Sequence, residues 1–449
     1  FLLNLKLSQN RQHVKCNQKT ALFVSVEISP DETTKFIQRS HHVSLAIDCS
    51  GSMDGKKIHD AKQAAINVVQ RLSPNDLVSI VTFETEVNVI LNPTPASDQN
   101  IENIIHSIDV GGATALHGGI AMAFQLLQQA SIPNAINRIE VFTDGEPNVV
   151  PYDDNDFENI VQEVRRNGIT LDVFGIGDDY NGPLLMKIAE CGGGKWEHVQ
   201  DTNALTTIVN NQVTEMQNTI ISNPQLVLTL MDGAELASAA ITKPTLQEIS
   251  TSDRLVSGNT VSMGLKDIIK DESQIVAIRI AVPPVEGENL SLVTAAITEA
   301  GHEISNQTAM ISCTDDKELY NLEVDPSPRV LLSSTEATVL LRKGLEGDSE
   351  ATQMAETILK NLDDQETTEL MNDNAHATLI NAQNIIGDIK PGMSVSEQKR
   401  VLHETTVIGN STVKANSNLI CQKCNAELRA ASKVCGNCGT LVNSLEGND

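Results

Sequence analysis

The sequence predicts an α/β domain with a mainly parallel sheet, inserted in an antiparallel β-sandwich and followed by a small helical segment and a cysteine-rich module. Apolar strands and amphipathic helices alternate over residues 41–218, which indicates a parallel sheet covered on both faces. The pattern then changes to alternating runs broken by Pro, Gly and Asp, over residues 222–342, which is typical of a sandwich. Two C-x-x-C pairs lie near the C-terminal end.

The 449 residues would make about three average domains, and the sequence divides into five segments. Ala21–Ile28 reads as a strand, but the N-terminal segment is too short to form a domain alone, because an isolated hairpin is marginally stable. We therefore expect it to supply strands to the sandwich. The expected segments are 1–40 (N-terminal sandwich strands), 41–218 (α/β domain), 219–342 (sandwich), 343–408 (helical segment) and 419–449 (cysteine-rich module).

The expected elements of the α/β domain follow from hydrophobic periodicity. Strands are predicted over 43–47, 77–83, 87–91, 138–143, 170–176 and, at a sheet edge, 195–199. Helices are predicted over 58–72, 97–107, 116–129, 157–167, 183–190 and 203–216.

Beyond the α/β domain, sandwich strands are predicted over 224–230, 260–265, 274–281, 290–298 and 330–341. Residues 344–348 are expected to link the sandwich to three short helices. Two of these helices carry apolar stripes within 354–362 and 370–385, and the third begins at a capping box formed by Ser394 and Glu397.

Composition excludes several classes of partner. The formal net charge of −27 opposes nonspecific binding to nucleic acids and to anionic membranes. No run of 18 apolar residues is present, so no membrane span is predicted. A homo-oligomer is compatible with the sequence.

One stretch concentrates oxygen ligands. The apolar run Val43–Ile47 is followed by Asp48, Ser50 and Ser52, with Gly51 allowing the backbone to turn. An Asp and two hydroxyls on one tight loop place three oxygens around a single point, and hard cations such as Mg²⁺ take ligands of this kind.

Two later stretches complete a pattern. Thr114 follows paired glycines, and Asp144 follows the predicted strand 138–143. Each stretch alone is an ordinary turn sequence. In this order, D-x-S-x-S after a strand, a Thr after glycines and T-D-G after a second strand closely resemble the von Willebrand factor A (vWA) domain with its metal-ion-dependent adhesion site. The resemblance covers about residues 41–218.

The resemblance implies a Rossmann-like domain whose metal-binding loops lie at the carboxyl ends of the strands, where open α/β sheets bind ligands. It implies that the serines and the threonine hold the metal directly and that the aspartates act directly or through water. Mg²⁺ is the preferred ion, with Ca²⁺ and Mn²⁺ as alternatives. The predicted insertion resembles the layout of integrin β subunits and Sec23/Sec24-type coat proteins. The implied ligands are Asp48, Ser50, Ser52, Thr114 and Asp144.

The function that follows is metal-dependent capture of a partner's Asp or Glu, without enzymatic activity. Neither G-x-x-x-x-G-K-[ST] nor G-x-S-x-G occurs in the sequence. One alternative is an accessory subunit of an AAA+ ATPase or kinase signalling complex. Others are a metal-dependent hydrolase with Glu146 as base, and a metal that merely joins three loops.

The C-terminal cysteines are spaced to bring four thiolates within reach of one Zn²⁺ and resemble a zinc ribbon. Disulfides or redox thiols are the alternative. The four predicted zinc ligands are Cys421, Cys424, Cys435 and Cys438.

The remaining four cysteines are scattered and are expected to be buried free thiols. The C-terminal thiol cluster with metal spacing indicates a reducing compartment and hence a cytoplasmic protein, although the start at Phe1 leaves a processed leader open. These cysteines are Cys16, Cys49, Cys191 and Cys313.

Overall fold

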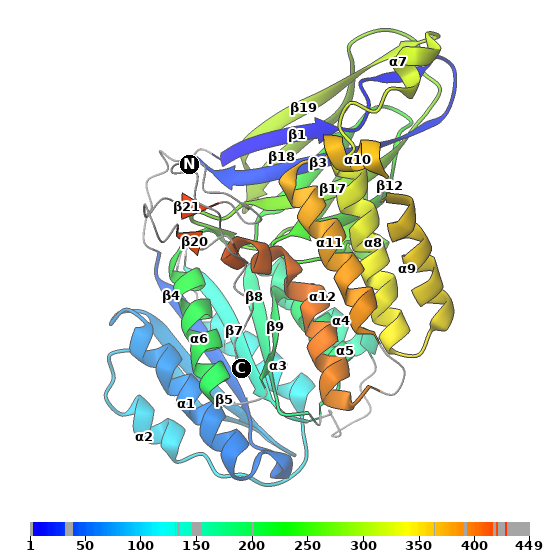
Figure 1. The fold of residues 1–449 in the computed structure, drawn as a ribbon. Helices are drawn as coiled ribbons and strands as arrows, with labels where there is room; N and C mark the ends of the chain where they lie inside the picture. The colour runs from blue at the N-terminus through cyan, green and yellow to red at the C-terminus, as the bar shows by residue number, and fades with distance from the viewer. Residues whose placement is uncertain are drawn as a thin grey trace.

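A computed structural model describes most of the chain, and the account below concerns its described residues. They are 3–31, 39–130, 132, 135–145, 154–178, 180–199, 202–362, 364–389, 393–415, 419–420 and 427–428. A domain with a parallel sheet lies at one end of the molecule, and two largely antiparallel sheets with a layer of helices lie at the other (Figure 1).

The α/β domain is built on a six-stranded sheet in the order β6-β5-β4-β7-β8-β9. Only β6 runs antiparallel to its neighbour. Every residue of β4 and β8 is buried, as expected for parallel strands covered on both faces. The strands are β4 (His41–Asp48), β5 (Leu77–Phe83), β6 (Val87–Pro95), β7 (Ile136–Thr143), β8 (Ile169–Ile176) and β9 (Gly193–Val199).

Three helices cover each face of this sheet and enclose two separate apolar cores. The alternation predicted over residues 41–218 is therefore confirmed, and the predicted strand 77–83 and helix 116–129 coincide with β5 and α3. One face carries α1 (Lys56–Arg71), α2 (Ile101–His106) and α6 (Thr202–Gln217). The other carries α3 (Leu116–Gln129), α4 (Asp154–Arg166) and α5 (Gly182–Cys191).

Strands from both sides of the α/β domain share one sheet. β3 (Thr20–Pro30) pairs antiparallel with β17 (Gln274–Val282) from Thr20 opposite Val282 to Ile28 opposite Gln274. The sheet has the order β1-β3-β17-β12-β13. Its other strands are β1 (Leu3–Gln9), β12 (Glu235–Lys243) and β13 (Gln247–Glu248).

A second sheet has the order β14-β15-β11-β18-β19-β2, and one apolar cluster joins the two sheets. Val24 and Val26 of β3 belong to the same core as Leu226 and Leu228 of β11. The strands are β2 (His13–Lys15), β11 (Gln225–Leu230), β14 (Arg254–Ser257), β15 (Thr260–Gly264), β18 (Leu290–Glu299) and β19 (His302–Thr314), and β10 (Thr219–Ile221) pairs with β16 (Ile268–Ile269) separately.

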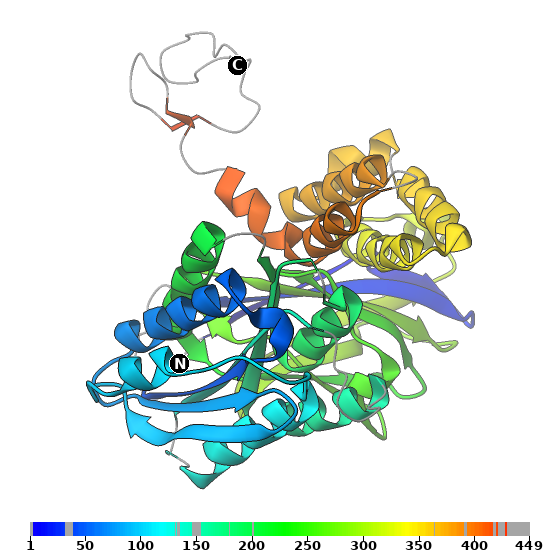
Figure 2. The same ribbon diagram turned by 90° about the horizontal axis from the view of Figure 1, so that it is seen from below.

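A helical layer covers the outer face of the first sheet (Figure 2). Ala240 and Ala277 of the sheet share a core with Val330 and Leu331 of α8. The capping box predicted at Ser394 is present, because the Ser394 backbone N donates to Glu397 Oε2 at 2.8 Å. None of the described helices is both long and apolar enough to cross a membrane. The helices are α7 (Lys317–Asn321), α8 (Ser327–Leu345), α9 (Ser349–Leu362), α10 (Gln365–Leu370), α11 (Asp373–Asp388) and α12 (Val395–Ala415).

The predicted strand over residues 330–341 is wrong, because this segment lies inside α8. The helix is buried around most of its surface, so its apolar run lacks the one-sided pattern that distinguishes a helix from a strand. Pro328 in the first turn is a helix-start signal. The Thr335 hydroxyl donates to the Leu331 carbonyl at 2.9 Å, which satisfies a polar group inside the helix.

The expectation of four free thiols is wrong for one pair. Cys16 and Cys313 form a disulfide with a Cα–Cα distance of 4.9 Å, whereas Cys49 and Cys191 are free. The parallel pairing of β2 with β19 brings the two cysteines together across 297 residues of sequence. Disulfides persist in oxidising compartments, so this pair does not support the predicted reducing compartment.

A buried ion triad joins the α/β domain to the antiparallel part. Arg138 of β7 donates through Nη1 to Asp172 and through Nη2 to Asp267, each at 2.7 Å. Asp267 lies immediately before β16 and also accepts from the backbone N of Asn223 at 2.9 Å. All three charged residues are less than one-tenth exposed.

We predict that Arg138→Met strongly destabilises the protein. Two carboxylates would remain buried without their cation, and breaking a buried pair in this way costs about 3–5 kcal/mol. Urea denaturation of both variants measures the effect, with Arg39→Met as the control. The Arg39 ion pair with Glu299 is partly exposed, so its loss should cost about 1 kcal/mol or less. Equal losses in the two variants would contradict a special role for the triad.

Candidate metal centre

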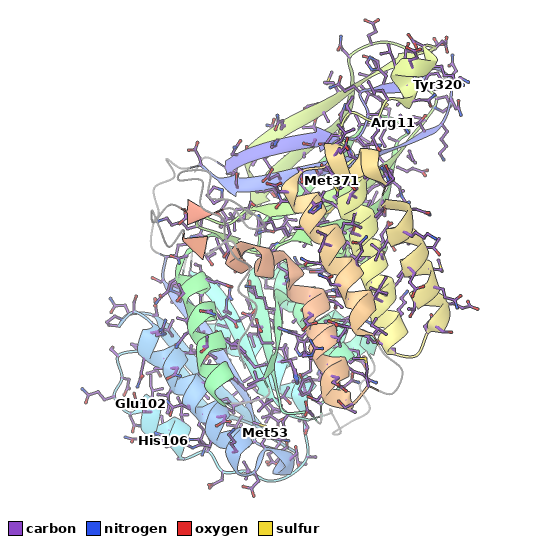
Figure 3. All side chains as sticks on the ribbon, viewed as in Figure 1. Arg11, Met53, Glu102, His106, Tyr320 and Met371 are labelled. Carbon is purple, nitrogen blue, oxygen red and sulfur yellow. A yellow bond between two sulfur atoms is a disulfide. The ribbon has the colours of Figure 1, made fainter. Side chains whose placement is uncertain are left out.

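The predicted ligands gather where the strand order reverses. β4 has β5 on one side and β7 on the other, so the carboxyl ends of β4 and β7 form the switch point at which open α/β sheets bind ligands. Asp48 ends β4, and Asp144 follows the last residue of β7. Met53, in the short turn after β4, marks this end of the domain in Figure 3.

Asp48 organises the first loop from a fully buried position. Its side chain is 0% exposed. Oδ1 accepts from the Ser50 backbone N at 2.9 Å, and Oδ2 accepts from the Thr143 hydroxyl at 2.6 Å. Burial raises the pKa of Asp48 to about 6, against the opposing effect of these hydrogen bonds. Both carboxylate oxygens are thus engaged by the protein, and Asp48 contributes position and charge from beneath the site.

Two hydroxyls and a carboxylate oxygen form a continuous row above Asp48. The hydroxyl oxygens of Ser50 and Ser52 are 3.2 Å apart, and the Ser52 hydroxyl donates to Asp144 Oδ1 at 2.8 Å. Ser50 and Asp144 are buried, whereas Ser52 is exposed. The row therefore opens to solvent at Ser52.

Thr114 joins this row from the loop before α3. The backbone N of Gly51 donates to the carbonyl of Gly112 at 3.2 Å, which fixes the Thr114 loop against the Ser50–Ser52 loop. A Cβ placed on Gly145 would lie 2.9 Å from Thr114 Oγ1 and 3.7 Å from Ser52 Oγ. Glycine at 145 thus leaves room for the two hydroxyls to converge. All five predicted ligands lie at one end of the sheet.

The oxygen spacings fit a small hard cation. Mg²⁺ binds six oxygens at about 2.0–2.1 Å, so adjacent oxygens of its octahedron lie about 2.9–3.0 Å apart. The Ser50–Ser52 and Ser52–Asp144 spacings of 3.2 and 2.8 Å lie on either side of that value. Hydroxyl and carboxylate oxygens are also the ligand types that Mg²⁺ prefers.

The sequence analysis missed Lys57, which contacts the site from the first turn of α1. Its Nζ lies 2.5 Å from Asp144 Oδ2, and the Asp144 side chain is 0% exposed. The ammonium therefore balances the charge of a buried carboxylate at the edge of the row. The available signal was its place in the first helical turn after the Asp48 loop, which points the side chain back toward that loop.

Cys49 lies beside the site but does not supply a nucleophile. Its thiol contacts the Phe83 carbonyl at 3.6 Å. Burial, followed by the nearby Asp48 charge, raises the pKa of Cys49 to about 11, so the thiol stays protonated at neutral pH. No group of three or more His, Cys, Asp or Glu side chains suited to a metal occurs in the described part of the chain. The candidate centre depends instead on hydroxyls.

The predicted zinc ligands Cys421, Cys424, Cys435 and Cys438 lie outside the described residues. Near them the structure describes a pair of two-residue strands, β20 (Leu419–Ile420) and β21 (Glu427–Leu428), which run antiparallel. The zinc ribbon stays a prediction.

Comparison with known proteins identifies the family to which the sequence of the α/β domain is similar. Residues 42–211 match the family described as von Willebrand factor type A domain. YfbK of Escherichia coli (strain K12) is 30% identical over 206 residues, which cover 45% of this chain and 36% of that protein. The Synechocystis protein sll0103 is 25% identical over 247 residues, 53% of this chain and 56% of that protein. The chain thus spans less than two thirds of the length of either relative.

A solved structure supports the fold over a longer range. The von Willebrand factor type A protein from Catenulispora acidiphila superposes with a TM-score of 0.73 over 90% of this chain and 96% of that chain, at 18% identity. The similarity in fold therefore extends beyond the matched family region. Together with the parallel sheet and the loops at its switch point, these findings show that residues 42–211 form a von Willebrand factor type A domain.

Proposed function

We propose that this chain is a metal-dependent protein-binding module that captures a partner's Asp or Glu at its adhesion site. Domains of this family commonly mediate protein–protein interaction. The observation that carries the proposal is the row of Ser50, Ser52 and Asp144 oxygens at the switch point, with successive spacings of 3.2 and 2.8 Å. Asp48, Ser50, Ser52, Thr114 and Asp144 would hold Mg²⁺, or alternatively Mn²⁺ or Ca²⁺.

Charge explains why a metal would be needed. Asp48 and Asp144 place two carboxylates at the site of a chain whose formal net charge is −27, and Lys57 compensates one of them. An acidic partner would be repelled by the remaining charge. A bound divalent cation would supply a positive centre that a partner's carboxylate can approach, and the exposed Ser52 marks the open side of the row.

The surroundings favour binding over catalysis. Hydrolysis would need an activated nucleophile or a positioned base. The Cys49 thiol is held protonated, and Lys57 is paired with Asp144. Glu146, the base considered from the sequence, lies outside the described residues. An accessory role in an ATPase or kinase complex would use the same capture chemistry with a different partner.

The first test removes one hydroxyl from the open side of the row. Ser52→Ala should weaken Mn²⁺ binding, measured by electron paramagnetic resonance, at least tenfold, or about 1.4 kcal/mol. It should also abolish the EDTA-sensitive recovery of partners in a pull-down. Ser52 is a better position than Asp48, because Asp48 is fully buried and its loss would leave the Ser50 N–H and the Thr143 hydroxyl unpaired.

Ser97→Ala is the control, because Ser97 is exposed on the same domain outside the site. If wild type recovers the same partners with and without EDTA, or if Ser52→Ala recovers them as well as wild type does without EDTA, carboxylate capture through the metal is wrong. If Mn²⁺ binds but the amount of partner recovered is the same with and without Mn²⁺, the metal merely joins the three loops.

The second test concerns the ammonium of Lys57. A dication and Lys57 would both interact with the buried Asp144 carboxylate, and their like charges would repel each other. We therefore expect Lys57→Met to raise Mn²⁺ affinity roughly tenfold and to lower the stability of the metal-free protein, because Asp144 loses its cation. Lys56→Met removes a neighbouring exposed charge and should change neither quantity. Unchanged metal affinity in Lys57→Met would rule out this competition.

We also propose a structural Zn²⁺ held by Cys421, Cys424, Cys435 and Cys438. Elemental analysis of protein purified under reducing conditions should give one zinc per chain. Cys421→Ser combined with Cys424→Ser should remove it, since a four-thiolate site cannot close with two ligands. Cys191→Ser removes a free thiol elsewhere and should retain the metal. A zinc-free wild-type protein would refute this site.

A further inference from the structure

The end of the molecule farthest from the adhesion site carries a basic cavity. It has a volume of about 540 Å³ and lies between the turns that flank β2 and the segment that joins α7 to α8. Arg11 and Tyr320, which line it, lie at the opposite end of the molecule from Met53 in Figure 3. The cations in its lining are Arg11, Lys15, Lys19 and Arg329.

Three of these four cations form no ion pair with a carboxylate, although the charge of Arg11 contributes to lowering the pKa of Glu323. Glu323, the one acidic residue in the lining, accepts from Arg329 Nε at 3.0 Å and Nη2 at 2.8 Å. No ion pair to a carboxylate within the described part of the chain is made by Arg11, Lys15 or Lys19. A chain with net charge −27 thus gathers four cations and one carboxylate around one cavity, a formal charge of 4 − 1 = +3.

Arg11 and Tyr320 add a more specific signal. Arg11 Nη1 donates to the Tyr320 carbonyl at 3.3 Å, but its buried Nε has no acceptor among the described residues. A buried donor without a partner is costly. An acceptor from a bound ligand would satisfy the Arg11 Nε–H. Lys15 Nζ lies 5.9 Å from the centre of the Tyr320 ring, which leaves its ammonium directed to an aromatic face instead of a carboxylate.

The segment that carries these cations is held in place. The backbone N of Asn10 donates to the Phe23 carbonyl, and the Phe23 N donates to Asn10 Oδ1, both at 2.9 Å. The Cys16–Cys313 disulfide ties the far end of the segment to β19. A fixed loop loses little conformational freedom when a ligand binds, so the cations are already arranged for a partner.

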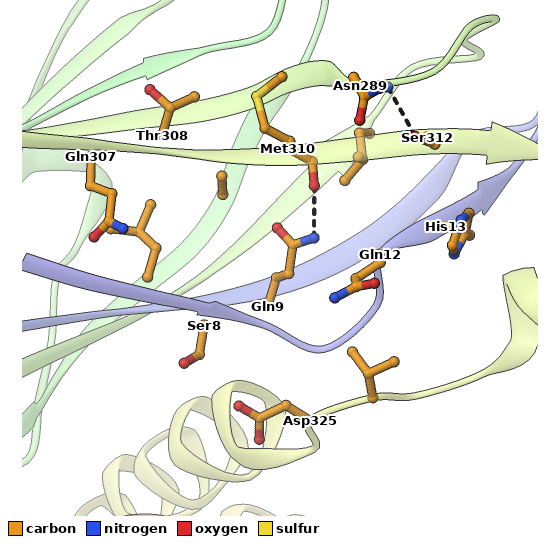
Figure 4. Close-up of a pocket in the computed structure, with 14 residues that line it drawn as sticks. Ser8, Gln9, Gln12, His13, Asn289, Gln307, Thr308, Met310, Ser312 and Asp325 are labelled. Carbon is orange, nitrogen blue, oxygen red and sulfur yellow. Dashed lines mark hydrogen bonds between the residues drawn. The ribbon is translucent and has the colours of Figure 1, made fainter.

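Positive charge is not a general property of this end of the molecule. A neighbouring cavity of about 650 Å³ lies between β1 and β19 and is lined mainly by amides, hydroxyls and apolar groups, with His13 and Asp325 as its titratable side chains (Figure 4). Gln9 Nε2 donates there to the Met310 carbonyl at 2.8 Å. The basic cavity is therefore a local feature.

We propose that the basic cavity binds an acidic peptide segment of a protein partner. Carboxylates of the segment would pair with Arg11, Lys15 and Lys19. A peptide suits the site better than a single small oxyanion because the lining includes Phe23 and Tyr320, and Leu319 and Leu322 nearby are 40% and 54% exposed. Repulsion by the rest of the chain is screened beyond about 10 Å at 0.1 M salt.

A labelled peptide of six glutamates and two leucines provides the probe, with binding followed by fluorescence anisotropy. EDTA is present throughout, so that the adhesion site cannot contribute. Lys15→Gln combined with Lys19→Gln should weaken binding at least tenfold. Lys6→Gln combined with Lys270→Gln removes the same charge from exposed positions outside the cavity and should leave the affinity unchanged. Binding should weaken as salt is raised from about 50 to about 300 mM.

Several outcomes would overturn the proposal. These are absence of peptide binding, equal loss in both double variants, and equal affinity for a peptide with glutamines in place of glutamates. Displacement of the peptide by about 10 mM inorganic phosphate would assign the cavity to a small oxyanion instead. Ser52→Ala should bind the peptide normally, which separates this site from the adhesion site.

Discussion

The hydrogen bond from Thr143 to Asp48 is the contact on which the candidate metal centre depends. It joins the ends of β4 and β7 at 2.6 Å, where Ile47 lies opposite Phe142 in the register. A shift of one residue would turn every side chain of the strand to the opposite face, and the Asp48 loop would then lose its neighbour. Because Asp48 is fully buried, its charge is sustained by the Ser50 N–H of its own loop and by the Thr143 hydroxyl that this register supplies. The row of hydroxyls above it is a consequence of strand pairing.

Strand β7 and the residue after it show three ways of burying charge. Arg138, at the amino end, is paired with Asp172 and Asp267. Glu140, in the middle, accepts no hydrogen bond within the described structure, and burial, followed by the Asp172 charge, raises its pKa to about 8, so it is protonated at neutral pH. Asp144, at the carboxyl end, is paired with a lysine that is itself one-quarter exposed. The partly exposed counter-ion thus lies at the candidate metal centre, and the buried ones lie at the junction with the antiparallel sheets.

The sequence allowed the α/β part and the meeting of its loops to be predicted, because each buried strand is an apolar run and the carboxyl ends of parallel strands share one edge. The antiparallel part was harder. β12 and β19 were not predicted, because Glu235–Lys243 is rich in alanine and His302–Thr314 is rich in polar residues. Neither segment shows a clear alternation of apolar and polar residues. Lys57 was not assigned to the site because the predicted helix began at residue 58, whereas α1 begins at Lys56 and places Lys57 in its first turn. The Cys16–Cys313 bond spans 297 residues, and no local pattern reports a contact at that distance.

The placement of the α/β domain decides how a signal could travel from it. Entry and exit of the domain are adjacent, because the ring of His41 lies 3.3 Å from the Met216 carbonyl and Arg39 pairs with Glu299 of β18. Two adjacent connections would suit a hinge. The Arg138 triad opposes hinge motion, because separating the domain from Asp267 would leave buried charges unpaired at a cost of about 3–5 kcal/mol. Coupling between two binding sites typically amounts to about 1–3 kcal/mol. If the proposed metal or partner binding supplies coupling of this size, it would not separate the domain from Asp267, and its effects would pass through the loops at the switch point.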